Sequence, residues 1–207
     1  MQNNWKLSKD ILNILGTIYN RFEFDGMLLE RISDKDIKDL QNVDGLEDIL
    51  IDTENGKRVH PMLETSFLTV TDSTHRISIL FSGDGTSVSV SMRGNLIAVT
   101  EKTNDSIEIT WVPFINLAIG AACSFLRTNL TKGVLVITEE ENGVVLQGIL
   151  AESLDNPDTY NLEWTDFSEN SRNDAFPQET VSGEEAENHI NSFLAKAHSH
   201  CLQGVSK

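Results

Sequence analysis

The chain opens with a helical pattern of apolar residues. Between residues 11 and 22 they recur every three or four positions, which predicts an amphipathic helix with Ser8 as its N-cap. Trp5 is expected to pack back onto the first turn. The stretch FEFDGM ends this helix, and SDKDIKDL offers a second helix start, with Ser33 and Asp36 in capping relation. The apolar positions of the first helix are Ile11, Leu12, Leu15, Ile18, Tyr19 and Phe22.

A short hairpin and a further helix follow. In LEDILIDTENGKRVHPM, Ile49 and Ile51 alternate with polar neighbours, and Asn55-Gly56 is a strong hairpin turn. HPMLETSFLTV then predicts a helix with Pro61 in its first turn. Two helices and a hairpin resemble part of a winged helix. Neither helix carries a basic recognition face, so the pattern argues against DNA binding.

The middle of the chain alternates with the period of β-strands. RISILFS, TSVSVSM, NLIAVTE and SIEITWVPF are separated by turn-forming residues, and VLVIT, VVLQGILAE and YNLEWTDF form a second meander. The stretch EEENG is read as the first turn of that second meander. A linker rich in Asn, Ser and Pro then leads to a last helix, SGEEAENHINSFLAKAHSH, capped by Ser182. The pattern predicts an α+β fold with mostly antiparallel sheet and flanking helices.

One apolar run raises the question of a membrane span. No charged residue occurs between Ile109 and Leu126. This run is barely long enough to cross a bilayer, and its first third alternates like a strand up to Pro113. We therefore interpret it as a strand followed by a buried core helix from about Ile115 to Arg127.

Two segments of the chain share a pattern at a separation of 53 residues. Each reads as a strand with Trp-x-x-Phe, a connection and a helix, which suggests two related halves, 1–130 and 131–207, sharing one core as one compact domain. Chance alignment of two amphipathic strands is the alternative. The matched residues are Ile107, Ile109, Trp111 and Phe114 in the first segment and Tyr160, Leu162, Trp164 and Phe167 in the second.

Charge is concentrated in one quarter of the chain. The formal net charge is −16, and residues 139–187 hold fourteen acidic residues against the single Arg172. Nucleic acid and anionic lipid surfaces require cationic contacts, so neither is an expected partner. A basic protein would be steered toward this segment, although a solvated acidic face that aids solubility gives the same composition. The candidate partner-binding residues are Glu139, Glu140, Glu141, Asp155, Asp158, Glu163, Asp166 and Glu169.

The cysteines and the first residues bear on the compartment. Cys123 and Cys201 form no paired motif, which is typical of reduced thiols in a cytosolic protein. Asp10 interrupts the first apolar stretch, and no small-residue cleavage site follows, which argues against a secretory signal. A cytoplasmic location is the expectation.

Candidate chemistry is sparse. HSHC, residues 198–201, has metal-ligand character, but His189 lies too far along the same helix to complete a zinc site, so a solvated helix end is the simpler interpretation. No GxSxG elbow is present. Glu163 and Asp166 interleave with aromatic residues and are the one candidate acid pair, with outward acids on an edge strand as the alternative. No cofactor is implied.

Two stretches resemble the EspG-type chaperones associated with ESX (type VII) secretion. GLEDILIDTENGKRVHPMLETSFLTV, Gly45 to Val70, is similar to their hairpin, Val-x-Pro step, helix and strand meander, and YNLEWTDF followed by ETVSGEEAENHINSFLAKA is similar in order to their ending. The resemblance implies a cytosolic α+β protein that keeps a helical secretion substrate soluble and delivers it. It transfers no individual binding residue.

The functional expectation is a protein that binds another protein and is not an enzyme. A chaperone or adaptor for a secreted substrate comes first, and an immunity protein that neutralises a basic toxin through an acidic face comes second. A hydrolase that uses carboxylates near Glu163 and Asp166 is the alternative from another class. The partner is thus a helical secreted protein or a basic toxin.

Overall fold

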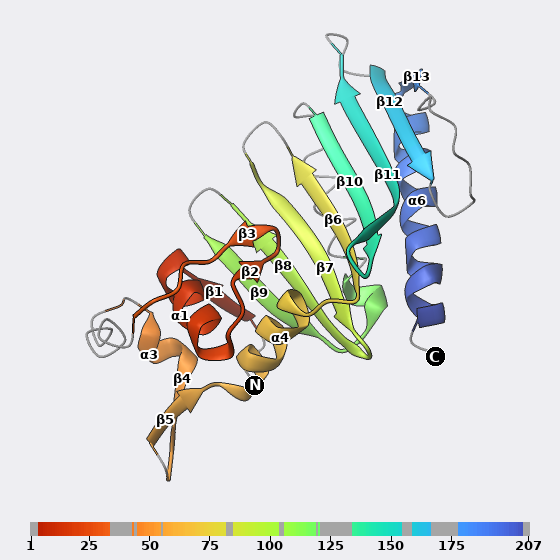
Figure 1. The fold of residues 1–207 in the computed structure, drawn as a ribbon. Coiled ribbons are helices and arrows are strands. Elements are labelled where there is room, and N and C mark those ends of the chain that lie inside the picture. The colour runs from red at the N-terminus through yellow and green to blue at the C-terminus, as the bar shows by residue number, and fades with distance from the viewer. Residues whose placement is uncertain are drawn as a thin grey trace.

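The computed structural model contains one nine-stranded sheet in the order β1-β9-β8-β7-β6-β10-β11-β12-β13, with every neighbouring pair antiparallel (Figure 1). The α+β class and the mostly antiparallel sheet are therefore confirmed. The structure describes residues 4–33, 43, 45–54, 56–81, 85–103, 106–118, 120, 134–154, 159–166 and 178–204. The strands of this sheet are β1 Asn4–Leu7, β6 His75–Phe81, β7 Ser87–Arg93, β8 Leu96–Lys102, β9 Ile107–Val112, β10 Val134–Glu141, β11 Val144–Ser153, β12 Thr159–Asp166 and β13 Gln178–Ser182.

An N-terminal layer covers one side of half of this sheet. Its helix α4 lies over the strands β7, β8 and β9 (Figure 1). Phe24, Leu63 and Phe67 of the layer and Ile109 of the sheet belong to one buried apolar cluster. The layer consists of α1 Lys9–Tyr19, the hairpin β2 Glu23–Phe24 and β3 Met27–Leu28, α3 Leu46–Ile49, the hairpin β4 Leu50–Thr53 and β5 Gly56–Val59, and α4 Pro61–Thr71.

The local signals in this layer act as the sequence predicts. Ser8 accepts a hydrogen bond from the Ile11 N–H at the start of α1. Pro61 occupies the first turn of α4. Where these two helices end, Arg21 forms a double hydrogen bond with Asp72, with Nε–Oδ1 at 2.5 Å and Nη2–Oδ2 at 3.0 Å. This pair joins the layer's two main helices.

A single long helix covers the opposite side of the sheet. Helix α6, Gly183–Gly204, packs on β11, β12 and β13 (Figure 1). Its start is a capping box, in which Ser182 Oγ accepts from the Glu185 N–H while the Glu185 carboxylate accepts from the Ser182 N–H. Ile190 and Phe193 of this helix join Ile137 and Leu162 of the sheet in a second buried cluster. Each half of the sheet is therefore covered by helices on a different side.

Three details of the predicted elements are wrong. Asn4–Leu7 is an edge strand that the pattern did not predict, although Trp5 is buried in one cluster with Ile11 and Leu12 of the first helix, as expected. The sequence EEENG is not a turn as a whole, because β10 continues through Glu141 and only Asn142 and Gly143 turn, both with positive φ. The linker before the last helix contains the strand β13, Gln178–Ser182. This strand pairs with β12 and forms the edge of the sheet.

The apolar run after Pro113 is only partly described. Residues 115–118 and 120 are helical, with Ile115 and Ala118 buried but Leu117 exposed. The rest of the predicted core helix, and the predicted second helix at SDKDIKDL, lie outside the described residues. Within the part of the chain that the structure describes, no helix has the length and apolar character to cross a membrane.

The two segments with the 53-residue match occupy related places in the sheet. Strands β9 and β12 each lie second from an edge, at opposite ends of the strand order. Ile107 and Ile109 face the N-terminal layer, whereas Tyr160 and Leu162 face α6. Repeated halves are not shown by this arrangement, and a duplication stays a prediction.

Candidate partner-binding face

The described helices leave one side of the C-terminal half of the sheet uncovered. We call the side chains of β10, β11 and β12 that point away from α6, together with Leu80 of β6, the open face. Among the described elements, helix α4 of the N-terminal layer packs on β7, β8 and β9 and accepts a hydrogen bond from Arg76 at the start of β6, whereas α6 lies on the other side of the strands (Figure 1). On the open face, no described element forms a second layer over the sheet, and sheets of this kind ordinarily bury their apolar faces.

The strand register shows which residues share this face. One row across the four strands is Leu80, Val136, Leu150 and Glu163, and the next is Ser78, Thr138, Gly148 and Thr165. Leu80 is 45% exposed, and Val136 and Leu150 are partly exposed. The absence of a side chain at Gly148 leaves a shallow hollow of about 190 Å³ that Val136, Thr138 and Thr165 also line. The centre of the open face is thus apolar and concave.

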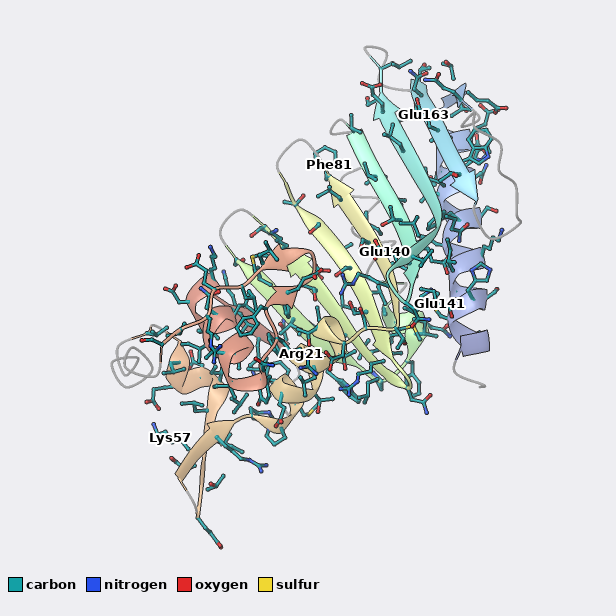
Figure 2. All side chains as sticks on the ribbon, viewed as in Figure 1. Arg21, Lys57, Phe81, Glu140, Glu141 and Glu163 are labelled. Carbon is teal, nitrogen blue, oxygen red and sulfur yellow. The ribbon has the colours of Figure 1, made fainter. Side chains whose placement is uncertain are left out.

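Acidic residues surround this apolar centre. Glu152 lies opposite Val134, one row beyond Val136, and Glu140 lies beyond Thr138 at the other end. Glu163 completes the set on β12, next to Leu150. Figure 2 shows Glu163 toward the upper end of β12 and Glu140 lower down, where β10 ends.

The sequence did not single out all of these residues. Glu152, Val136 and Leu150 were missed as partner-binding candidates. A signal existed, because VLVI and GILA are apolar at successive positions, whereas an antiparallel strand with one solvated side normally alternates with polar residues.

One predicted partner-binding residue is buried on the other side of the sheet. Glu139 is fully buried and faces α6, so the expectation that it contacts a partner is wrong. Glu141, two positions later, is exposed but also lies on the α6 side. Glu140 and Glu163 are the two predicted residues that the structure brings to the open face. Asp155, Asp158, Glu169 and the side chain of Asp166 lie outside what the structure describes.

Glu139 is the centre of a buried polar cluster. Its Oε1 lies 2.8 Å from Nε2 of His75 on β6 and 3.0 Å from Nδ1 of His200 on α6. The side-chain amide of Gln147, on β11, donates to Oε2. We call these four residues the Glu139 cluster. Through one carboxylate, the cluster connects β6, β10 and β11 with the end of α6. The sequence analysis predicted a solvated helix end at His198 to Cys201, whereas His200 packs against the sheet.

The cluster shifts the pKa values of its members. Burial of His75 disfavours its charged form, but hydrogen bonds with Cys201 and Glu139 outweigh this and raise the pKa of His75 to about 10. Burial would raise the pKa of Glu139, yet His75, Gln147 and His200 together hold it below its ordinary value. Both shifts favour a charged pair inside the fold.

These pKa shifts predict a pH dependence of stability. Because folding raises the His75 pKa from 6.5 to about 10, its contribution is complete below pH 6.5 and is lost as the pH rises toward 10. The lowered pKa of Glu139 gives a contribution that is present above pH 4.5 and is lost as the pH falls. Urea unfolding at a series of pH values from about 6 to about 10 should show that the free energy of unfolding of the wild type falls as the pH rises. In His75→Gln, this dependence on pH should be weaker. Equal slopes in the two proteins would refute this assignment.

A second concave surface lies on the α6 side of the sheet. This groove has a volume of about 530 Å³, and its lining includes Met92, Ile97, Phe114, His198 and Leu202. Acidic residues are absent from its described lining, in contrast to the open face. Among the described residues, no three His, Cys, Asp or Glu side chains are placed to hold a metal ion.

Comparison with known proteins does not identify a family for this chain, because no protein-family model matches the sequence and no curated protein is significantly similar to it.

Proposed function

We propose that this protein binds another protein through the open face and acts as a chaperone or adaptor for it. The observation that carries the proposal is the uncovered half of the sheet, whose outward side chains at Leu80, Val136 and Leu150 are apolar. Contiguous exposed apolar surface with a polar rim is typical of a protein-interaction site. A secreted helical substrate, kept soluble in the cytoplasm, is the partner class that the resemblance to EspG-type chaperones favours.

The acidic rim supports one other candidate function. Glu140, Glu152 and Glu163 could meet the basic surface of a toxin, as in an immunity protein. The two functions differ in their response to salt. Apolar contact survives high ionic strength, whereas steering by exposed charges is screened beyond about 10 Å at 0.1 M salt.

The hydrolase alternative receives little support from the described geometry. Glu163 lies on β12 opposite Leu150. The side chain of Asp166 lies outside the described residues, so the carboxylate pair that this alternative requires is not among the described contacts.

A matched pair of leucine substitutions tests the proposed function. Leu80 on the open face and Leu202 at the groove are 45% and 50% exposed. The tagged protein is co-expressed with the products of neighbouring genes, and the captured partner is quantified for the wild type, Leu80→Ser and Leu202→Ser. We expect Leu80→Ser to weaken binding about tenfold, since burying a leucine side chain contributes about 1.5 kcal/mol or more. Leu202→Ser should bind like the wild type.

The reverse result would refute the open face as the binding site. If Leu202→Ser loses the partner while Leu80→Ser keeps it, the groove at Phe114 is the contact surface instead. Thermal unfolding of each variant serves as the control for folding. Exposed leucines contribute little to stability, so both variants should unfold close to the wild type, within about 0.5 kcal/mol.

A further inference from the structure

The dimensions of the open face restrict what can cover it. Neighbouring strands lie about 4.8 Å apart, so β6, β10, β11 and β12 span about 14 Å between the outer two. An α-helix with its side chains is about 10–12 Å wide. The uncovered area is therefore wide enough for one helix, and the opposite half of the sheet is covered by helices in the same manner.

The acidic residues are spaced along the direction that such a helix would follow. Glu152 is opposite Val134, and Glu140 is six positions farther along β10. Six strand residues correspond to about 20 Å, which is the length of about 13 helical residues. Glu163 lies between these ends on β12. A helix on the apolar centre would thus have a carboxylate near each end and one beside it.

One cation, Arg76, lies beside this rim. Arg76 is the cross-strand neighbour of Glu140, but its guanidinium donates to the Val70 carbonyl and to Ser73 Oγ, and it lies 3.9 Å from Asp25. Those contacts hold the Arg76 guanidinium toward the N-terminal layer. Although Arg76 and Glu140 line the same pocket, no ion pair joins them among the described residues.

Charge also decides between possible occupants. A second copy of this chain would bring a net charge of −16 and the same acidic rim to the contact. Like charges at an interface are unfavourable, whereas cationic groups beside these carboxylates would be attracted. The hollow at Gly148 adds room for one projecting apolar side chain in the middle of the face.

From these observations, and resting on the proposed function, we propose that the open face binds an amphipathic helix of a partner protein whose apolar stripe is flanked by Lys or Arg near both ends. The apolar stripe packs on Leu80, Val136 and Leu150 and projects a side chain into the hollow at Gly148. The basic residues, about 13 positions apart, pair with Glu140 and Glu152.

Synthetic peptides test this inference on the full-length protein. One is an amphipathic helix of about 16 residues with a leucine stripe and lysines at both ends, the second has glutamates in place of the lysines, and the third is a scrambled version of the first. Fluorescence anisotropy at about 0.05 M and 0.5 M salt measures their affinities. We expect the lysine peptide to bind about tenfold or more tightly than the other two at low salt, with the difference shrinking at high salt.

Variants locate the contact. Gly148→Leu fills the hollow, and the fold should accept a side chain there, because a Cβ on Gly148 would lie 3.5 Å from its nearest neighbour, the Ile137 carbonyl oxygen. We expect this variant to lose peptide binding, and the double variant Glu152→Lys/Glu163→Lys to weaken it about tenfold. Glu101→Lys is the matched charge control, because Glu101 is an exposed acid on β8 that lies on the α6 side of the sheet. This variant should change peptide affinity less than about twofold. Amide chemical shifts of the wild type should change along β10, β11 and β12.

The outcomes separate this inference from the proposed function. Equal binding of the lysine and glutamate peptides, or shifts confined to the groove at Phe114 and Leu202, would overturn the basic-helix inference. If the peptides give one of these results but Gly148→Leu no longer captures the natural partner, the open face remains the binding site. Only the inferred chemistry of its occupant is then wrong. If Gly148→Leu and Leu80→Ser both retain that partner fully, the proposed function itself fails.

Discussion

Replacing Glu139 with alanine is expected to lower the free energy of unfolding by about 3–5 kcal/mol. The substitution removes the carboxylate that lies 2.8 Å from His75 and 3.0 Å from His200. His75 is left buried with a charge that no longer has its counter-ion, and the amide of Gln147 loses its acceptor. The loss is large because a buried charge without a partner costs far more than the pair itself contributes.

Urea unfolding at pH 6 measures this effect, and a neighbouring residue provides the control. Glu141→Ala removes an exposed carboxylate from the same strand and should change stability by less than about 0.5 kcal/mol. Glu139→Gln keeps the shape and should fall between the two. A Glu139→Ala protein as stable as Glu141→Ala would show that the Glu139 cluster does not hold α6 to the sheet.

This difference between neighbouring acids changes how charge variants should be designed. Reversing Glu139, Glu140 and Glu141 to lysine together would test an acidic surface only if all three were exposed. In the structure, the first is buried and the other two point to opposite sides of the sheet. Loss of partner binding in such a triple variant would therefore report on folding as well as contact, and Glu140 or Glu163 alone is the cleaner probe.

The arrangement of strands was predictable from local patterns. Period-two alternation located β6 to β9 and β10 to β12, and the capping residues Ser8 and Ser182 located the starts of α1 and α6. These features depend on residues close in sequence. The short strands β1 and β13 were missed because each has one pairing partner at an edge and little internal pattern.

The buried cluster was not predictable in the same way. Glu139 and His200 are 61 positions apart, and glutamate is a residue type that is almost never fully buried unless it is paired. Glu139 stands in a run of three acids, which resembles a solvated turn until its partners from β6, β11 and α6 are known. Its burial depends on tertiary contacts alone.

The candidate binding face lies between these two cases. The sequence shows that Val136 and Leu150 are apolar at positions where a half-solvated strand would be polar. It does not show that the helices cover β7 to β9 on one side and β11 to β13 on the other. The open face results from that offset, because an apolar position is a binding candidate only where the protein's own helices leave it uncovered.

A second large effect is expected in the N-terminal layer. Phe67 on α4 is completely buried and stacks on Phe24 at a centroid distance of 5.4 Å, with Tyr19 at 5.8 Å. Phe67→Ala removes the ring that joins α1, α4 and the β2-β3 hairpin. We expect a loss of about 3–5 kcal/mol, the usual cost of truncating a buried aromatic side chain to alanine.

Thermal and urea unfolding of Phe67→Ala measure this loss, with Leu28→Ala as the control. Leu28 lies on the same hairpin but is 77% exposed, so its truncation should have little effect. The N-terminal layer does not cover β10 to β12, and the fraction of Phe67→Ala that remains folded should bind the lysine peptide with wild-type affinity. Weakened peptide binding by folded Phe67→Ala, at a temperature well below its unfolding transition, would mean that the layer takes part in recognition. The open face would then extend across β7 rather than end at β6.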